Sequence, residues 1–352
     1  MRIGILTHHY INNFGAFLQA YSLQQAIKEL HPEADVYIIN CVNIKHFIIN
    51  TGGWFRFYRK KENIACWTQK IKLPWTFSRA RKKYMNLTKI CYDSRGIEKL
   101  KLDYIVVGSD EVWNYCETKG NAKVKFGIGL NKEKLIAYAP SVGETKENDI
   151  PDYVIKGIKR FKAVSARDYL TEKLVEKIRE EEIERVVDPT FLVKIPNESV
   201  KGINRPYILF YYCDGLKEEE KEKIFAYAKN KKMDIYGAGE CDKKYSDITV
   251  NLTPFQWVWM FRNAEYVITG TFHGAVFSML NHRQFACYLT NPSRIEKVGS
   301  LLKEFDLDEK QTNGTAEELI KQLEKRIDYD VVEIKFDAGR EQSREFLVDN
   351  IT

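Results

Sequence analysis

Residue types that can do chemistry gather at residues 267–280, which read VITGTFHGAVFSML. A β-branched run ends at Thr269, Gly270 interrupts it, and an apolar run of helical character follows His273. The pattern therefore places one histidine at a strand-to-helix turn, where open α/β sheets bind their ligands. An isolated histidine at a helix start is more often a polar residue without a chemical role. The two threonines and two glycines around this one favour a site.

A second candidate turn is the segment GSDEVWN at residues 108–114, directly after an apolar strand. Asp110 is able to accept hydrogen bonds from sugar hydroxyls or to act as a base, and Trp113 is able to stack on a sugar. The equally weighted alternative is that Ser109 or Asp110 caps the N-terminus of a helix.

A third turn contains Arg167 at the end of the strand-like run 163–166. Its planar guanidinium suits phosphate or carboxylate, and the alternative is a surface ion pair with Asp168 or Glu172. The turn at residues 7–16 lacks both the GxGxxG and the GxxxxGK[ST] patterns, which argues against a dinucleotide and a P-loop. Adjacent histidines at positions 8 and 9 point to opposite sides of an extended chain, so a metal site there is not expected.

The elements that must position these turns alternate between strands and helices. Strands are expected at 3–6, 36–39, 104–107, 135–139, 163–166, 185–188, 207–212, 234–236, 266–269 and 284–288. Helices are expected near 17–30, 169–182, 218–231, 254–263, 295–305, 316–326 and 340–350. Such alternation predicts two mostly parallel sheets covered by helices, and a cleft between two such domains is the default ligand site.

The domain boundaries follow from the same pattern. A linker rich in proline, glycine and asparagine at 194–205 separates a first domain, 1–195, from a second, 205–330, and a tail with a crossover helix occupies 331–352. The first domain carries an aromatic and basic insertion at about 44–89.

Composition limits the class of protein. The chain has 352 residues, 44% hydrophobic and 30% charged, with a net charge of +6. These values are typical of a globular protein of two ordinary domains. Seven scattered cysteines without CxxC spacing argue against a disulfide framework and a zinc site. No run approaches the roughly 20 apolar residues of a membrane span, so a cytoplasmic location is expected.

Taken in order, these turns resemble the blocks of the polysaccharide pyruvyl transferase family. The matching segments are NFGA at 13–16 with Gln19, VGSDEVWN at 107–114, APSVG at 139–143, SARD at 165–168, VDPT at 187–190 and TGTFHGAVFS at 269–278. The turn at 11–15 is less glycine-rich than in some members. The resemblance implies two Rossmann-like domains facing a cleft, as in GT-B glycosyltransferases, with the last helix crossing back. It also implies transfer of pyruvyl from phosphoenolpyruvate to a sugar diol as a ketal, with release of phosphate.

This interpretation assigns roles to particular residues. Catalysis is expected of His273, Asp110 and Arg167. Donor binding is expected of Arg167, Thr271, His273, Gly274, Ala275, Ser141 and Gly143. Acceptor binding is expected of Asn13, Gly15, Gln19, Ser109, Asp110 and Trp113. A helix N-terminus disfavours a charged imidazole, so His273 is expected to be a competent acid chiefly when the anionic donor is bound. Whether it acts as acid or base is left open.

Partners and alternatives complete the set of expectations. No metal and no cofactor is expected beyond phosphoenolpyruvate as co-substrate, and no nucleic-acid motif is present. The acceptor is a sugar, free or lipid-linked. The basic aromatic segment 56–89 leaves peripheral association with the inner face of a membrane open, with a solvated surface as the alternative. The competing functions are a glycosyltransferase that uses a nucleotide sugar, for which YGAGE at 236–240 is a weak pocket candidate, and a carbohydrate-binding protein without catalysis.

Overall fold

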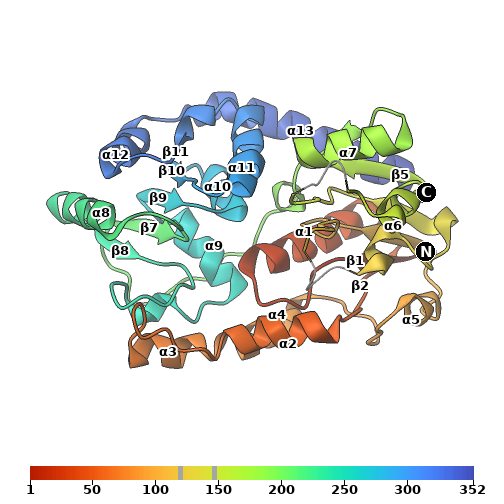
Figure 1. Cartoon of the computed structure of the whole chain (residues 1–352), viewed down its shortest axis with the longest axis horizontal. Helices are drawn as coiled ribbons and strands as arrows, with labels where there is room; N and C mark the ends of the chain where they lie inside the picture. Colours follow the sequence, from red (N-terminus) through yellow and green to blue (C-terminus); the bar gives the residue numbers. More distant parts are fainter. Residues whose placement is uncertain (118–121, 145–148) are drawn as a thin grey trace. The chain divides into compact units, whose positions relative to one another are not determined.

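The computed structural model describes residues 1–117, 122–144 and 149–352, and the chain divides into two compact units (Figure 1). Unit 1 comprises residues 1–53, 78–194 and 336–352, and unit 2 comprises residues 54–77 and 195–335. The sequence led us to place all of 44–89 in the first domain, but residues 54–77 cluster with unit 2. The chain therefore passes between the units four times.

Unit 1 contains a six-stranded parallel sheet in the order β2-β1-β3-β4-β5-β6. Its strands are β1 (Arg2–Leu6), β2 (Asp35–Ile38), β3 (Tyr104–Val107), β4 (Leu135–Ala137), β5 (Ala163–Ala166) and β6 (Glu184–Arg185). The strand order reverses between β1 and β3, because β2 lies on one side of β1 and β3 on the other. In open α/β sheets, ligands bind at the carboxyl ends of the strands at such a reversal.

The helices of unit 1 surround this sheet and its apolar core. They are α1 (Phe14–Leu30), α2 (Ile44–Gly53), α4 (Leu73–Tyr84, with most of its residues in unit 1), α5 (Ser94–Glu98), α6 (Asp152–Ile158) and α7 (Tyr169–Arg179). Helix α1 is capped by Asn13, whose side chain accepts from the amide of Ala16. Helix α7 is capped by Asp168, which accepts from the amide of Thr171. The core joins strand residues such as Val107 to side chains from the following loops and helices.

Unit 2 contains a five-stranded parallel sheet in the order β11-β10-β9-β7-β8. Its strands are β7 (Tyr207–Tyr211), β8 (Asp234–Tyr236), β9 (Tyr266–Thr269), β10 (Gln284–Tyr288) and β11 (Gln311–Thr312). Here the order reverses between β7 and β9. The turn that contains His273 follows β9, so it lies at the switch point of unit 2.

The helices of unit 2 are α3 (Ile64–Lys70), α8 (Glu218–Asn230), α9 (Pro254–Arg262), α10 (Phe272–Leu280), α11 (Pro292–Glu304) and α12 (Ala316–Glu324). The final helix, α13 (Tyr329–Asn350), begins in unit 2 and ends in unit 1. This arrangement agrees with the expected crossover helix, although α13 starts eleven residues earlier than the sequence pattern indicated.

Several strand ends differ from the sequence-based expectation, and the backbone gives the reason. Strand β7 ends at Tyr211 because Tyr212 adopts a left-handed conformation with φ of 48°. Strand β4 ends at Ala137 rather than Ala139, which has φ of 51°. Strand β6 is only two residues long, because Asp188 starts a 3-10 turn with Pro189. Among the residues described, no helix is long and apolar enough to cross a membrane.

Candidate active site

The turn between β9 and α10 is built by two threonines. Thr271 is the N-cap of α10, and its Oγ1 accepts a hydrogen bond of 3.0 Å from the amide of Gly274. The buried Thr269 closes the turn, because its Oγ1 accepts from the amide of Thr271 at 3.2 Å. Two hydroxyl groups therefore fix the backbone on which His273 stands.

The two glycines of this turn are required by close approach. A Cβ on Gly274 would lie 2.0 Å from Oγ1 of Thr269, and one on Gly270 would lie 2.3 Å from the carbonyl oxygen of Tyr212. No side chain fits at such distances without moving the backbone or the capping threonine. The turn thus brings the ends of β7 and β9 into direct backbone contact.

His273 is the second residue of α10 and is half-buried at the switch point of unit 2. Its ring packs edge-on against Phe272, with 5.4 Å between ring centroids. We expected the amides of Gly274 and Ala275 to bind the donor anion, but both are used within the helix. The first bonds Oγ1 of Thr271 and the second bonds the Thr271 carbonyl. An anion at this end would meet the amides of the first residues of the helix, because these amides have no partner within the helix.

A carboxylic acid not singled out by the sequence also reaches this switch point. The amide of Tyr212 donates to Oε2 of Glu240 at 3.0 Å, and burial raises the pKa of Glu240 to about 7. Arg294 adds a cation, since it donates to the carbonyl of Gly270 at 3.2 Å and pairs with Asp214 at 2.8 Å. His273 therefore shares its switch point with an acid that titrates near neutrality and with a guanidinium group.

In unit 1, Arg167 lies at the centre of a buried polar cluster. Its Nη1 pairs with Asp188 and lies 3.3 Å from the hydroxyl of Ser109, while Nη2 lies 3.3 Å from Oδ1 of Asp110. Burial opposes the charge on Arg167, but the carboxylates of Asp188 and Asp110 outweigh it and raise the pKa. The guanidinium side chain is only 4% exposed. An anionic substrate would have to compete with two carboxylates for it, and neither Asp168 nor Glu172 is the ion-pair partner that the sequence suggested.

Asp110 is the member of this cluster that reaches the surface. Its side chain is 17% exposed, whereas that of Asp188 is fully buried. No helix follows β3 directly, so neither Ser109 nor Asp110 is a helix cap as the alternative required. Ser109 is fully buried and donates to the carbonyl of Ala139 at 3.0 Å. Its expected contact with the acceptor stays a prediction without support from this buried position, while Asp110 keeps an accessible carboxylate at the end of β3.

Other predicted contact residues also lie inside unit 1. Trp113 is fully buried, stacks on Phe126 and donates from Nε1 to the Lys125 carbonyl at 2.8 Å, so its position gives no support to the expected stacking on a sugar. Gln19 is fully buried and donates to Oγ1 of Thr7 at 2.9 Å. Ser141 is fully buried, and its hydroxyl accepts from the amide of Gly143 at 3.1 Å.

The residues at the start of α1 have a different environment. Asn13 is exposed, and its side chain is the cap described above. Gly15 is buried in the first turn of the helix. The expected role of both residues in acceptor binding stays a prediction.

A buried lysine and two buried histidines occupy the end of β1. The Nζ of Lys125 lies 3.0 Å from Nδ1 of His8, and the Nε2 of His8 lies 3.3 Å from the carbonyl of Glu111. Burial, followed by the charge of Lys125, lowers the pKa of His8 well below its ordinary value. Burial also lowers the pKa of His9 to about 4 and that of Lys125 to about 7. Both imidazoles are therefore neutral at pH 7. Within the described residues, no three metal-ligating side chains gather into a cation site.

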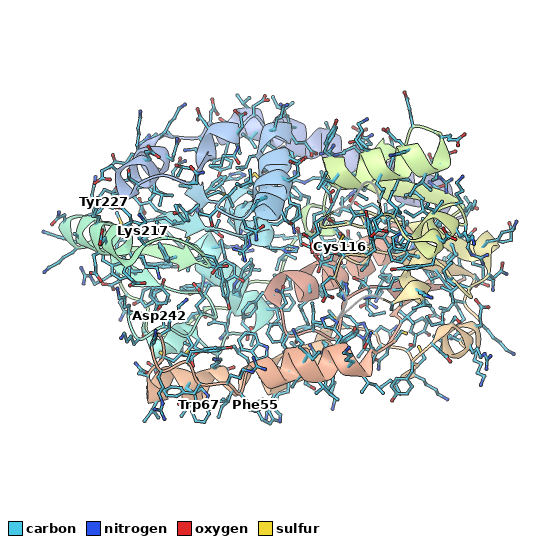
Figure 2. All side chains as sticks on the ribbon, in the orientation of Figure 1. Phe55, Trp67, Cys116, Lys217, Tyr227 and Asp242 are labelled. Atoms are coloured by element: carbon cyan, nitrogen blue, oxygen red, sulfur yellow. The ribbon has the colours of Figure 1, made fainter. Side chains whose placement is uncertain are left out.

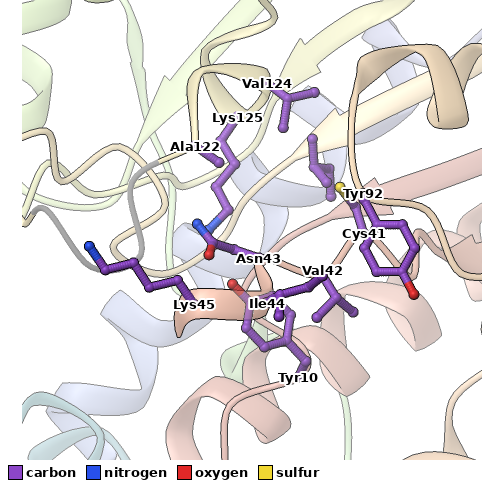
Figure 3. Close-up of a pocket in the computed structure, with 11 residues that line it drawn as sticks. Tyr10, Cys41, Val42, Asn43, Ile44, Lys45, Tyr92, Ala122, Val124 and Lys125 are labelled. Atoms are coloured by element: carbon purple, nitrogen blue, oxygen red, sulfur yellow. The ribbon is translucent and has the colours of Figure 1, made fainter. Parts of the chain in front are cut away.

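Lys125 also lines a cavity of about 320 Å³ in unit 1 (Figure 3). The cavity opens beside Leu6, the last residue of β1, and Tyr10, Asn43 and Lys45 contribute polar groups to its wall. In Figure 3, Lys125, Asn43 and Lys45 line one flank, and Cys41 and Tyr92 line the other. A volume near 300 Å³ with a few convergent polar groups is the usual size of a small-ligand site.

Sequence reasoning had little chance of finding Lys125 and Glu240. Lys125 stands between apolar residues in a segment without repeats, and only its burial distinguishes it from a surface lysine. Glu240 ends the YGAGE segment, in which only the glycines indicated a pocket. Asp188 belongs to one of the family-like blocks, but its pairing with Arg167 requires the two strand ends to be neighbours, as β5 and β6 are.

Comparisons with known proteins agree with this architecture. Solved structures that cover nearly the whole chain include the following three. A putative UDP-N-acetylglucosamine 2-epimerase from Listeria monocytogenes has a TM-score of 0.53 at 9% identity, covering 97% of this chain and 90% of that one. UGT71G1 of Medicago truncatula, complexed with UDP-glucose, has a TM-score of 0.53 at 9% sequence identity, covering 99% of this chain and 98% of that one. UGT89C1 of Arabidopsis thaliana, complexed with UDP-L-rhamnose, has a TM-score of 0.53 at 6% sequence identity, covering 100% of this chain and 99% of that one.

At these identities the likeness concerns the fold alone, and the fold is of the GT-B type. A search of curated proteins finds no match. The model of the family described as polysaccharide pyruvyl transferase matches residues 13–292, a span that includes the turns of Asp110, Arg167 and His273. The chain belongs to the polysaccharide pyruvyl transferase family.

Proposed function

We propose that this protein transfers the pyruvyl group of phosphoenolpyruvate to two hydroxyls of a sugar in a surface polysaccharide or its lipid-linked precursor. One hydroxyl oxygen bonds to the phosphate-bearing carbon, while the adjacent methylene carbon takes up a proton and becomes a methyl group. The second hydroxyl oxygen then displaces phosphate from the same carbon. The products are a cyclic ketal and inorganic phosphate, and the reaction needs no oxidant, reductant or further cofactor.

The observation that carries the proposal is the position of His273. In a chain of this family, a half-buried histidine stands on a doubly capped turn at the switch point of unit 2. Protonation of carbon requires a positioned acid, and a histidine held by a rigid turn meets that requirement. The dianionic phosphate and the carboxylate of the donor would raise the pKa of His273, against the effect of the helix dipole.

Glu240 is a second source of protons at the same switch point. Its pKa of about 7 means that a large share of the molecules carry a neutral carboxyl at neutral pH. Glu240 returns a proton to the site after each turnover in this proposal, and Arg294 neutralises part of the donor's charge. The donor-binding roles expected of Ser141 and Gly143 have no support in their buried, internally bonded positions.

Unit 1 receives the acceptor in this proposal. Asp110 is the accessible carboxylate that accepts a hydrogen bond from the attacking hydroxyl and removes its proton. Arg167 acts as a positioning residue, because its guanidinium holds Asp110 in place through Nη2 while Nη1 binds Asp188. The cavity beside Lys125 accommodates a sugar ring, for which Tyr10 and Asn43 supply apolar and hydrogen-bonding surface.

The test follows phosphate release from phosphoenolpyruvate by ³¹P NMR, with a panel of free and lipid-linked galactose, mannose and glucosamine derivatives as acceptors. The wild-type protein should release phosphate and add pyruvate to one acceptor, as seen by mass spectrometry. The variant His273→Ala should lose turnover with an unchanged thermal unfolding profile. The control is His282→Ala, which removes an exposed imidazole of the same unit that pairs with Glu333.

Two results would show that the protein has a different function. Consumption of a nucleotide sugar, with no phosphate released from phosphoenolpyruvate, would establish glycosyl transfer. Saturable sugar binding without any turnover would establish a carbohydrate-binding protein. Full turnover by His273→Ala would remove that residue from the mechanism while leaving the reaction itself in place.

A further inference from the structure

The basic charge of the chain is concentrated in one stretch. Residues 44–89 contain twelve lysines and arginines and a single acidic residue, Glu62, for a net charge of +11. The whole chain has a net charge of +6, so the remaining residues are acidic on balance. Such segregation creates a local positive field that an even distribution would cancel.

The same stretch also exposes apolar side chains. Of the 18 large apolar side chains that are strongly exposed in the described residues, nine lie between residues 44 and 75. Ile64 is 72% exposed and Trp75 is 56% exposed. Single exposed apolar residues are ordinary, but a concentration of this kind marks an interaction surface.

Within unit 2, these side chains gather with basic ones. We name as the basic aromatic surface the exposed basic and large apolar residues of segment 54–77, which are Phe55, Arg56, Phe57, Tyr58, Arg59, Lys60, Lys61, Ile64, Lys72 and Trp75. The ring of Phe55 packs edge-on against Trp75 with 5.7 Å between centroids, and Phe57 packs against Trp67 at 5.8 Å. Figure 2 shows Phe55 and Trp67 side by side, and Nε1 of Trp67 donates to the Phe55 carbonyl.

This surface is held in shape by a buried ion pair. Nζ of Lys70 lies 2.5 Å from Oε1 of Glu62, and it also donates to the carbonyl of Arg56 at 2.7 Å. The other oxygen of Glu62 accepts from the amide of Tyr58 at 3.0 Å. The only acidic residue of the segment is thus held inside, so the charged side chains that the segment exposes are all basic. The exposure is built into the loop rather than left by fraying.

Helix α2 in unit 1 repeats the pattern. None of its ten residues is buried, and Ile44, Phe47, Ile48 and Ile49 are all strongly exposed, with Lys45 among them. A helix without a buried face lacks the packing that usually stabilises helices in globular proteins. It would gain that stabilisation from an apolar environment outside the chain.

We infer that the basic aromatic surface docks on an anionic lipid bilayer. Lysines and arginines are attracted to anionic headgroups, and aromatic rings settle at the boundary between headgroups and hydrocarbon. A single-stranded nucleic acid would also use basic and aromatic groups, but it stacks on rings. The most exposed large apolar side chain of the surface is the aliphatic Ile64, which favours hydrocarbon. The inference goes beyond the proposed function, because docking does not depend on the reaction.

Flotation with vesicles tests the inference on the full chain. The protein should bind vesicles of mixed phosphatidylglycerol and phosphatidylcholine, and should bind phosphatidylcholine alone far more weakly. Each basic residue near an anionic surface contributes about fivefold in affinity, so the triple variant R59Q/K60Q/K61Q should bind on the order of 100-fold more weakly. Raising the salt from about 0.1 M to 1 M shortens the screening length from roughly 10 Å to 3 Å and should have a comparable effect.

A matched control separates this surface from net charge. The variant K229Q/K231Q/K232Q removes three exposed lysines of the same unit elsewhere and should bind as the wild type does. The double variant I64S/W75S keeps every charge and should also lose binding, with Tm measured for each variant to confirm folding. Equal loss in the control triple variant, equal binding to both vesicle types, or preferential binding of single-stranded RNA would each overturn the inference. Pyruvyl transfer to a free sugar acceptor should be unchanged in all three variants, so failure of the proposed reaction would be detected separately.

Discussion

Replacing Arg167 by methionine tests whether the cluster at the end of β5 is held by that guanidinium. The substitution keeps an apolar stem of similar length but removes the cation that touches Asp188 and Asp110. Asp188 has no solvent-exposed side-chain surface, so water is unable to replace the lost partner. Removing one member of a buried pair costs about 3–5 kcal/mol, because the other charge stays behind unpaired.

Asp110 should contribute little to that cost, because its partly exposed carboxylate can be solvated and its distance to Arg167 is longer. The free energy of unfolding of unit 1 should therefore fall by about 3–5 kcal/mol, which is roughly 6–20 °C in Tm for a unit of 150–250 residues. Guanidinium denaturation, followed by circular dichroism and tryptophan fluorescence, measures the change.

The double variant R167M/D188N separates charge from packing. A neutral amide at position 188 removes the stranded charge, so the double variant should recover part of the lost stability. A loss of less than about 1 kcal/mol in Arg167→Met, or a full further loss on adding Asp188→Asn, would show that the guanidinium does not hold this cluster. A large rise in KM for phosphoenolpyruvate with unchanged stability would instead return Arg167 to its expected role as a donor-binding residue.

Three further perturbations have signs fixed by the structure. Gly274→Ala should lose activity and about 2 kcal/mol or more of stability, since its Cβ would meet Oγ1 of Thr269 at 2.0 Å. The control in thermal unfolding is Gly299→Ala, which should be tolerated because its Cβ would face the flexible end of Gln311 at 3.1 Å. Lys125→Met should be more stable than the wild type near pH 6, and the difference in unfolding free energy should shrink toward pH 9. The reason is that the folded wild type loses the buried charge of Lys125 as pH rises above about 7, while the unfolded chain keeps that proton. A difference that does not change with pH would contradict this. The stability of Glu240→Gln relative to the wild type should increase between about pH 5 and pH 8, because a pKa of about 7 for Glu240 makes the wild type lose stability as pH rises through that range. Urea titrations at both pH values measure the difference in unfolding free energy. A difference that stays constant would show that Glu240 does not have a raised pKa.

The repeated strand-and-helix pattern made the two parallel sheets predictable, because parallel strands are continuous apolar runs separated by helical spacing. Local signals also placed His273 and Asp110 at strand ends, and the structure keeps both at switch points. Ends of elements were less predictable. The left-handed conformation of Tyr212 has no local signature in the sequence. The 3-10 turn after Asp188 does have one, because Asp188 caps the amide of Thr190 and Pro189 follows it, but this signal lies within the run that the strand pattern claimed.

The burial of the predicted contact residues could not be read from the sequence, for a physical reason. Trp113, Gln19 and Ser141 have side chains suited equally to binding a sugar and to completing a core, and only burial distinguishes the two. Arg167 shows the same ambiguity, since a guanidinium that fits phosphate also fits carboxylate. The partner that decided the outcome, Asp188, lies 21 residues further along the chain.

Helix α13 has a consequence for how the chain is made. Residues 336–352 belong to unit 1, where Phe336 packs on Phe191. The hydroxyl of Ser343 accepts a hydrogen bond from the amide of Val187, and Arg344 donates to the carbonyl of Leu192. These residues leave the ribosome only after all of unit 2 has been synthesised. The nascent unit 1 must therefore wait, with the apolar site of Phe336 uncovered, while its neighbour is translated. Domains commonly fold in the order of synthesis, but here the first unit to be started is the last to be completed.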